Sequence, residues 1–167
     1  MKYFEIDAFF PIYKKEGPAQ TCILLTNGTK QYSHYSIRQF IPHLLYDTGL
    51  DERSIRLWSS KVTGSKHLLP LIIDNLNVFI PIKFAIEGEN NRISVVYGYV
   101  NLGSIAHYSN KEVILKSQVS LPTLSSIKYI EKKIVDAKLL TYAYLDIKKK
   151  YEFMWKEEAH MIEEMMK

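Results

Sequence analysis

The sequence has little cysteine and no long apolar run, and these absences exclude several classes of protein. Its 167 residues include one cysteine, Cys22, which rules out an intramolecular disulfide and a zinc site built on paired cysteines. The longest apolar runs, 68–73 and 78–82, are far shorter than the roughly 20 residues that a membrane-spanning helix needs. Glu5 and Asp7 interrupt the N-terminal apolar residues, unlike the core of a signal peptide. We therefore expect a soluble cytoplasmic protein without a membrane partner.

Signatures of common enzyme classes are absent as well. The chain has no glycine-rich phosphate-binding motif, no Gly-x-Ser-x-Gly and no His-Glu-x-x-His, and its five histidines are scattered. Cys22 lies in an apolar run, which favours a small buried side chain over a nucleophile. Ser65, His67 and Asp74 can be drawn as a triad, but a chain with this many serines allows such a set by chance. We expect no enzymatic activity, no metal and no cofactor.

What the chain does have is the composition of one folded domain. Apolar residues make up 47% and charged residues 24%, as in ordinary folded proteins. Runs rich in β-branched and aromatic residues predict strands at 3–10, 21–26, 30–35, 69–73, 78–84, 93–100 and 112–119. Asn27-Gly28 separates the second and third runs and is a strong hairpin signal, because both residues tolerate positive φ. The pattern predicts a largely antiparallel twisted β-sheet.

Helical patterns occur between the predicted strands at 30–35 and 69–73, and again at the end of the chain. Ser36 is suited to cap a helix that Gly49 would end, with Pro42 as a kink or a later start. Thr123 is suited to cap a long helix within 123–150, whose apolar stripe is Ile127, Ile130, Ile134, Ala137, Thr141 and Tyr144, with Lys128, Lys132, Lys133 and Lys138 off the stripe. A second helical piece is expected at 153–166. The fold class is therefore α+β, a sheet followed by C-terminal helices.

One basic segment carries no acid at all. From 53 to 73 the chain has four cations, no Asp or Glu, and many Ser, Thr and Gly residues, and we interpret 53–69 as a loop. Hydroxyls, glycine-freed N–H groups and Lys or Arg ends are the groups that contact DNA phosphates. The candidate DNA-binding residues are Arg53, Arg56, Ser59, Ser60, Lys61, Gly64, Ser65 and Lys66. The alternative is a solvated loop. For Trp58 we favour a core anchor over a wedge in a DNA groove.

The two ends of the C-terminal region differ in charge. Residues 113–150 have eight lysines against three acids, whereas 151–167 have two lysines against five glutamates. The acidic end also carries apolar residues that one sheet face does not cover, which indicates a partner. The candidate partner-binding residues are Met154, Trp155, Met161 and Met165. We accordingly divide the chain into an α+β DNA-binding domain, 1–150, and a helical extension for oligomerisation or partner binding, 151–167.

Four blocks occur in a fixed order in the middle of the chain. They are Ser59-Ser60 with Gly64 and Lys66, then 70–75 leading to 78–81, then Gly98–Asn101, and finally Leu121-Pro122. In this order, over about residues 53–140, the sequence resembles the ComK family of competence transcription factors. Trp58 stands where that family has a glycine, Ser65 stands where it has an arginine, and one extra residue precedes Gly64. Loss of a phosphate-contacting arginine removes one increment of counterion release from binding.

The resemblance implies a transcriptional activator of competence genes that binds AT-rich DNA through the minor groove as a homo-oligomer on paired sites. It also implies a protease adaptor as a possible partner. The minor groove offers a coarse A·T-versus-G·C code, read through its width and potential, so no recognition helix is needed. The alternative is an interaction module that does not bind DNA and modulates a related regulator through its C-terminal helices.

Overall fold

The computed structural model describes residues 2–13, 18–87 and 93–166. Its main sheet has six strands in the order β3-β2-β1-β6-β5-β4, and every neighbouring pair is antiparallel. These strands are β1 (Ile6–Ile12), β2 (Gln20–Leu25), β3 (Lys30–Ser33), β4 (Leu71–Ile72), β5 (Val78–Glu87) and β6 (Ile93–Asn101). The predicted antiparallel sheet is thus confirmed.

A smaller antiparallel sheet follows, made of β7 (Ile105–Tyr108), β8 (Glu112–Leu115) and β9 (Ser120–Pro122). Only β8 lies within a predicted strand, and it ends at Leu115 because a turn with Gln118 at φ +66° follows. β7 and β9 are short, and the sequence pattern did not predict them. Their pairing closes one end of the core beside β5.

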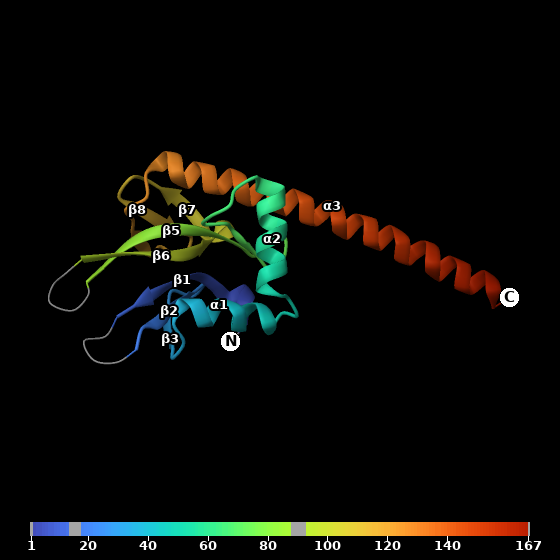
Figure 1. Ribbon diagram of the computed structural model, residues 1–167, viewed down its shortest axis with the longest axis horizontal. Helices are drawn as coiled ribbons and strands as arrows, with labels where there is room; N and C mark the ends of the chain where they lie inside the picture. The colour runs from blue at the N-terminus through green and yellow to red at the C-terminus, as the bar shows by residue number, and fades with distance from the viewer. Residues whose placement is uncertain (1, 14–17, 88–92, 167) are drawn as a thin grey trace.

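Three α-helices complete the described part of the fold: α1 (Ile37–Tyr46), α2 (Glu52–Thr63) and α3 (Ile127–Met165). The main sheet is covered on both faces (Figure 1). On one face α1 covers a cluster centred on Phe9, whose ring lies 5.2 Å from that of Phe40. On the other face, α3 and the small sheet cover a second cluster that includes Ile80, Ile82 and Leu140. Because successive strand residues point to opposite faces, Phe79 joins the first cluster and its neighbour Ile80 the second.

The local signals for the first hairpin and the first helix are confirmed. Gly28 has φ +80° in the turn between β2 and β3, a conformation that glycine adopts without strain. Ser36 caps α1 in a reciprocal capping box with Gln39, which satisfies the free N–H groups of the first turn. Gly49 has φ +75° just beyond the helix, and Pro42 is accommodated inside it.

The segment interpreted as a basic loop is mostly a helix, and this prediction was wrong. Residues 52–63 form α2, and only the turn from Gly64 to Leu69 is irregular. The charges obscured an apolar stripe, because Ile55, Trp58 and Val62 recur at steps of three and four and pack against the core. The Asp51 side chain accepts a hydrogen bond from the Ser54 N–H at 2.7 Å and so caps the helix.

The C-terminal region is one helix rather than two pieces. α3 has 39 residues, a length of about 58 Å at 1.5 Å per residue, and its second half projects well past both sheets (Figure 1). Its cap is Ser126, whose Oγ accepts from the Tyr129 N–H. Thr123 instead donates to the backbone carbonyl of Lys83 in β5. In the described ranges, no helix combines the length and apolarity needed to cross a membrane.

Candidate nucleic-acid interface

The predicted DNA-binding residues lie on α2 and the turn that follows it. Gly64 ends the helix in the left-handed conformation, φ +70°, and turns the chain back along the helix. Between α2 and this returning segment lies an open groove of about 620 Å³, with Arg53, Arg56, Ser60 and Lys66 in its lining. Four of the eight predicted residues therefore share one hollow of the surface.

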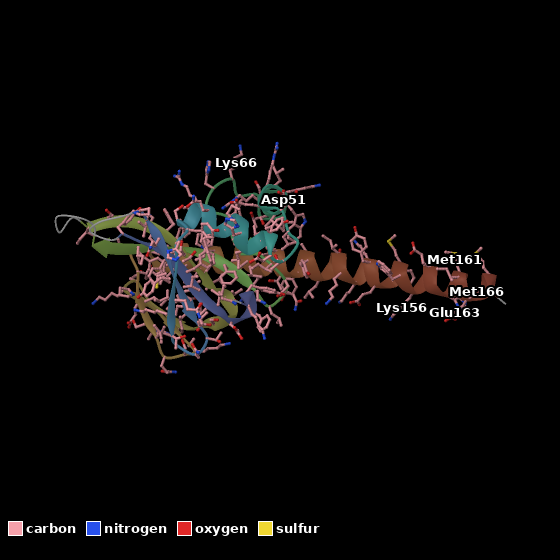
Figure 2. The ribbon with its side chains drawn as sticks, turned by 90° about the horizontal axis from the view of Figure 1, so that it is seen from below. Asp51, Lys66, Lys156, Met161, Glu163 and Met166 are labelled. Carbon is pink, nitrogen blue, oxygen red and sulfur yellow. The ribbon has the colours of Figure 1, made fainter. Side chains whose placement is uncertain are left out.

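The four cations of this surface differ in solvent exposure and in ion pairing. Arg53, Lys61 and Lys66 are exposed and take part in no ion pair among the described residues. Figure 2 shows Lys66 at the outer edge of the turn. Arg56 is half-buried, and its Nε lies 2.6 Å from Oε1 of Glu52. Three positive charges are therefore available to a ligand.

The environment of Arg56 fixes its charge. Partial burial by itself would lower the pKa of the guanidinium, but its hydrogen bonds to Glu52 and Tyr99 outweigh that effect and raise the pKa. Glu52 is the residue just before the acid-free stretch, and it neutralises Arg56 one helical turn away. The sequence count of four uncompensated cations is thus reduced to three.

The serines of this surface hold it together. Ser59 is fully buried in α2, and its Oγ has no hydrogen-bond partner among the described residues, so it does not face a phosphate outside the protein. The Ser60 hydroxyl donates to the carbonyl oxygen of Ser65 at 2.7 Å, and Ser65 Oγ lies 3.4 Å from Oδ2 of Asp136. Ser60 and Ser65 therefore fasten the turn that carries Lys66 to α2 and α3.

Asp136 belongs to a buried ion pair that the sequence pattern missed. Lys133 Nζ lies 3.5 Å from Asp136 Oδ2, and both side chains are more than nine-tenths buried. Burial lowers the pKa of Lys133, and the facing carboxylate offsets part of that effect. Lys133 was expected off the apolar stripe, on the solvent side. The contact of α3 with α2 encloses it instead.

Trp58, Cys22 and two residues of the drawn triad have structural contacts inside the protein. Trp58 packs against the cluster beneath α3, so the interpretation as a core anchor is confirmed. Cys22 is 2% exposed, and burial raises the pKa of its thiol. Ser65 is engaged by Asp136, and Asp74 accepts from the N–H groups of Leu76 and Asn77, so these two members of the drawn triad have other partners.

Gly98 and Asn101, two residues of the third block of the resemblance, have structural roles. A Cβ at Gly98 would lie 2.5 Å from the Cβ of Phe10, so β6 can approach β1 there only with glycine. The Asn101 amide donates to Asn77 Oδ1 at 3.2 Å, and Asn77 in turn donates to Asp74. These contacts fix the turn between β4 and β5 against the end of β6.

Comparison with known proteins gave no match among family models, curated proteins or solved structures. The resemblance to the ComK family therefore rests on the sequence blocks alone.

The predicted partner-binding residues lie together on the projecting half of α3. The exposed fractions of Met154, Trp155, Met161 and Met165 are 52%, 71%, 56% and 86%. In Figure 2, Met161 lies along the projecting helix with Lys156 and Glu163, well away from Lys66. The molecule thus presents a basic surface on its body and an acidic, apolar surface on its extension.

Proposed function

We propose that this protein is a DNA-binding transcriptional regulator of the competence type, which prefers AT-rich duplexes. One observation supports it above the others: Arg53 and Lys66 line one groove and Lys61 is exposed on the last turn of α2, while the acids just before them, Asp51 and Glu52, are already engaged. Asp51 caps α2, which lowers the pKa of its carboxyl through the Ser54 backbone N–H, and Glu52 pairs with Arg56. A phosphate backbone approaching this surface meets cations without having to displace a competing carboxylate.

The widths of the DNA grooves limit how the surface is used. An α-helix with its side chains is about 10–12 Å across, whereas the minor groove of B-DNA is about 6 Å wide. α2 therefore does not enter a minor groove, and its exposed residues Arg53 and Lys61 are assigned to phosphates. The narrower turn with Lys66 and His67 is assigned to the minor groove itself, where A·T-rich sequences have the stronger negative potential.

The proposal is tested by a salt series of binding to AT-rich and GC-rich duplexes. We expect tighter binding to the AT-rich duplex and a log–log salt slope close to the number of phosphate contacts. Reversal of both Lys61 and Lys66 to Glu should weaken binding by roughly tenfold per lost contact at about 0.1 M salt, and the loss of the phosphate contact of Lys61 should flatten the slope by roughly one unit.

The matched control is Lys111→Glu with Lys116→Glu, which makes the same charge change at two exposed lysines in the turns that precede and follow β8. This variant should keep an affinity and a slope much closer to wild type, since it changes the net charge without touching the proposed contact surface. Equal losses in both variants would show that total charge alone drives binding. No binding of the wild-type chain to either duplex at low salt would overturn the proposal.

A second function is favoured by the apolar extension. A chain that does not bind DNA would act as an interaction module, using the exposed side chains of α3 to modulate a related regulator. The observation behind this alternative is the row of exposed large apolar residues from Tyr151 to Met166, which is unusual for a surface without a partner. Negative salt-series results together with capture of a regulator by the isolated protein would establish it.

A further inference from the structure

The apolar seam of α3 continues beyond the part that the body covers. In the body, Ile130, Ala137 and Leu140 are fully buried against the sheets. Counting on from these residues by alternating steps of three and four gives Tyr144, Ile147, Tyr151, Met154, Glu158, Met161 and Met165. All but Glu158 are apolar, so the heptad spacing of a coiled coil persists over three further heptads.

Exposure along this seam rises where the body ends. Tyr144 is half-buried at the edge of the core, Ile147 is 39% exposed, and Tyr151 and Met154 are 58% and 52% exposed. Figure 1 shows the helix running straight on with no other element beside it. Because a lone helix does not bury one face by itself, the seam from 144 to 165 is a packing surface without its partner.

Charge is divided along the same half of the helix. Residues 145–154 have three lysines, Lys148, Lys149 and Lys150, against Asp146 and Glu152, a net charge of +1. Residues 155–166 have Lys156 against Glu157, Glu158, Glu163 and Glu164, a net charge of −3. A second copy lying parallel would place lysines beside lysines and glutamates beside glutamates. A second copy lying antiparallel places each basic block beside an acidic block, which is the favourable pairing.

We propose that two copies of this chain dimerise through residues 144–161 of α3, which pair as an antiparallel two-helix coil. The register that gives complementary charge pairs Tyr151 with Met154 of the second copy at the centre, and Tyr144 with Met161 at the ends. In this register Glu158, the one charged seam residue, lies level with Ile147 and next to Lys148 of the second copy. The overlapping segments, 144–161, are about 27 Å long.

This dimer holds the two bodies at opposite ends of the paired helices. Each acidic end then lies beside the body of the other copy. The inference rests on the seam and the charges of α3, and it does not depend on DNA binding.

Association is tested by sedimentation velocity of the full chain over a wide concentration range. The wild type should show a monomer–dimer equilibrium, and Met154→Lys should shift it to monomer, with a loss of at least roughly tenfold in the association constant because the charge is buried at the centre of the seam. The control is Phe153→Lys, at the adjacent residue, which is 63% exposed and lies off the seam. It should dimerise as the wild type does.

Orientation is tested by disulfide trapping, since Cys22 is buried and an introduced cysteine is the reactive one. An equal mixture of Ile147→Cys and Glu158→Cys chains should form the mixed disulfide in preference to either homodimer. Preferred Ile147→Cys homodimers would mean parallel pairing and would overturn the proposed register. A wild-type chain that stays monomeric, or a Phe153→Lys variant as impaired as Met154→Lys, would overturn the dimer.

Discussion

The two halves of α3 have the same apolar spacing but opposite surroundings. From 127 to 144 the seam packs against the core, and an ion pair in the same half, Lys133 with Asp136, is buried. From 145 to 165 the residues at the same spacing face solvent. The ion pair of this half, in which Lys150 Nζ lies 2.8 Å from Asp146 Oδ2, is exposed. Heptad spacing therefore specifies a packing face, whereas the element that covers this face is specified elsewhere in the chain.

The largest contrast is expected from truncating one seam residue in each half. Leu140→Ala should lower the free energy of unfolding by about 4 kcal/mol, because a fully buried leucine leaves a cavity. Ile147→Ala should change it by no more than about 0.5 kcal/mol in the monomer. Urea unfolding at low protein concentration measures both. Equal losses would mean that the projecting half packs on the body after all.

A second contrast comes from removing one member of each ion pair. Asp136→Ala should destabilise the fold by about 3 kcal/mol, because it leaves Lys133 buried without a counter-charge and releases Ser65. Asp146→Ala should leave the unfolding midpoint unchanged, since solvent screens the exposed Lys150. The double variant Lys133→Met with Asp136→Leu should recover most of the loss. Failure of this recovery would assign the pair a role other than charge compensation.

The smallest expected contrast is between Lys133 and Lys150, whose contributions to the free energy of unfolding change with pH in opposite directions. The folded-state pKa of Lys133 is lowered, so the folded chain releases that proton first, and stability from this group rises as pH rises toward the ordinary lysine pKa. The pKa of Lys150 is raised by its hydrogen bond to Asp146, so its contribution is present below the ordinary pKa and is lost as pH rises through the folded value.

Unfolding curves between about pH 8 and pH 11 for the wild type, Lys133→Met and Lys150→Met separate these two contributions. Relative to wild type, Lys133→Met should steepen the loss of stability at high pH, and Lys150→Met should reduce it. Slopes that change in the same direction would contradict the assignment of a buried and an exposed lysine.

Much of the fold was accessible from local pattern. The first hairpin followed from Asn27-Gly28, and α1 followed from Ser36 and Gly49, because a cap or a left-handed turn acts on neighbouring residues only. β7 and β9 were missed because strands this short carry little periodicity. α2 was missed because basic and hydroxyl residues dominated the composition, although Asp51, Ile55, Trp58 and Val62 carry a helical signal.

The candidate site was predicted in part. Arg53, Lys61 and Lys66 were predicted to contact DNA; they are exposed, and their role stays a prediction. Ser59, Ser60 and Ser65 were assigned to a ligand, but one is buried and two bond within the protein. A hydroxyl finds its partner through tertiary contact, as Ser65 does with Asp136, 71 residues away.

The sequence by itself determined the strands of the main sheet, the turn at Asn27-Gly28, the apolar seam of α3 and the charge of each segment. Each of these depends on residues close together in the chain, so periodicity and capping chemistry were enough. Only the tertiary structure decided that Lys133 is buried, that Ser65 is bonded to Asp136, and that the seam loses its cover after Tyr144. These outcomes depend on which elements meet across the core, and such long-range contacts leave no local pattern to read.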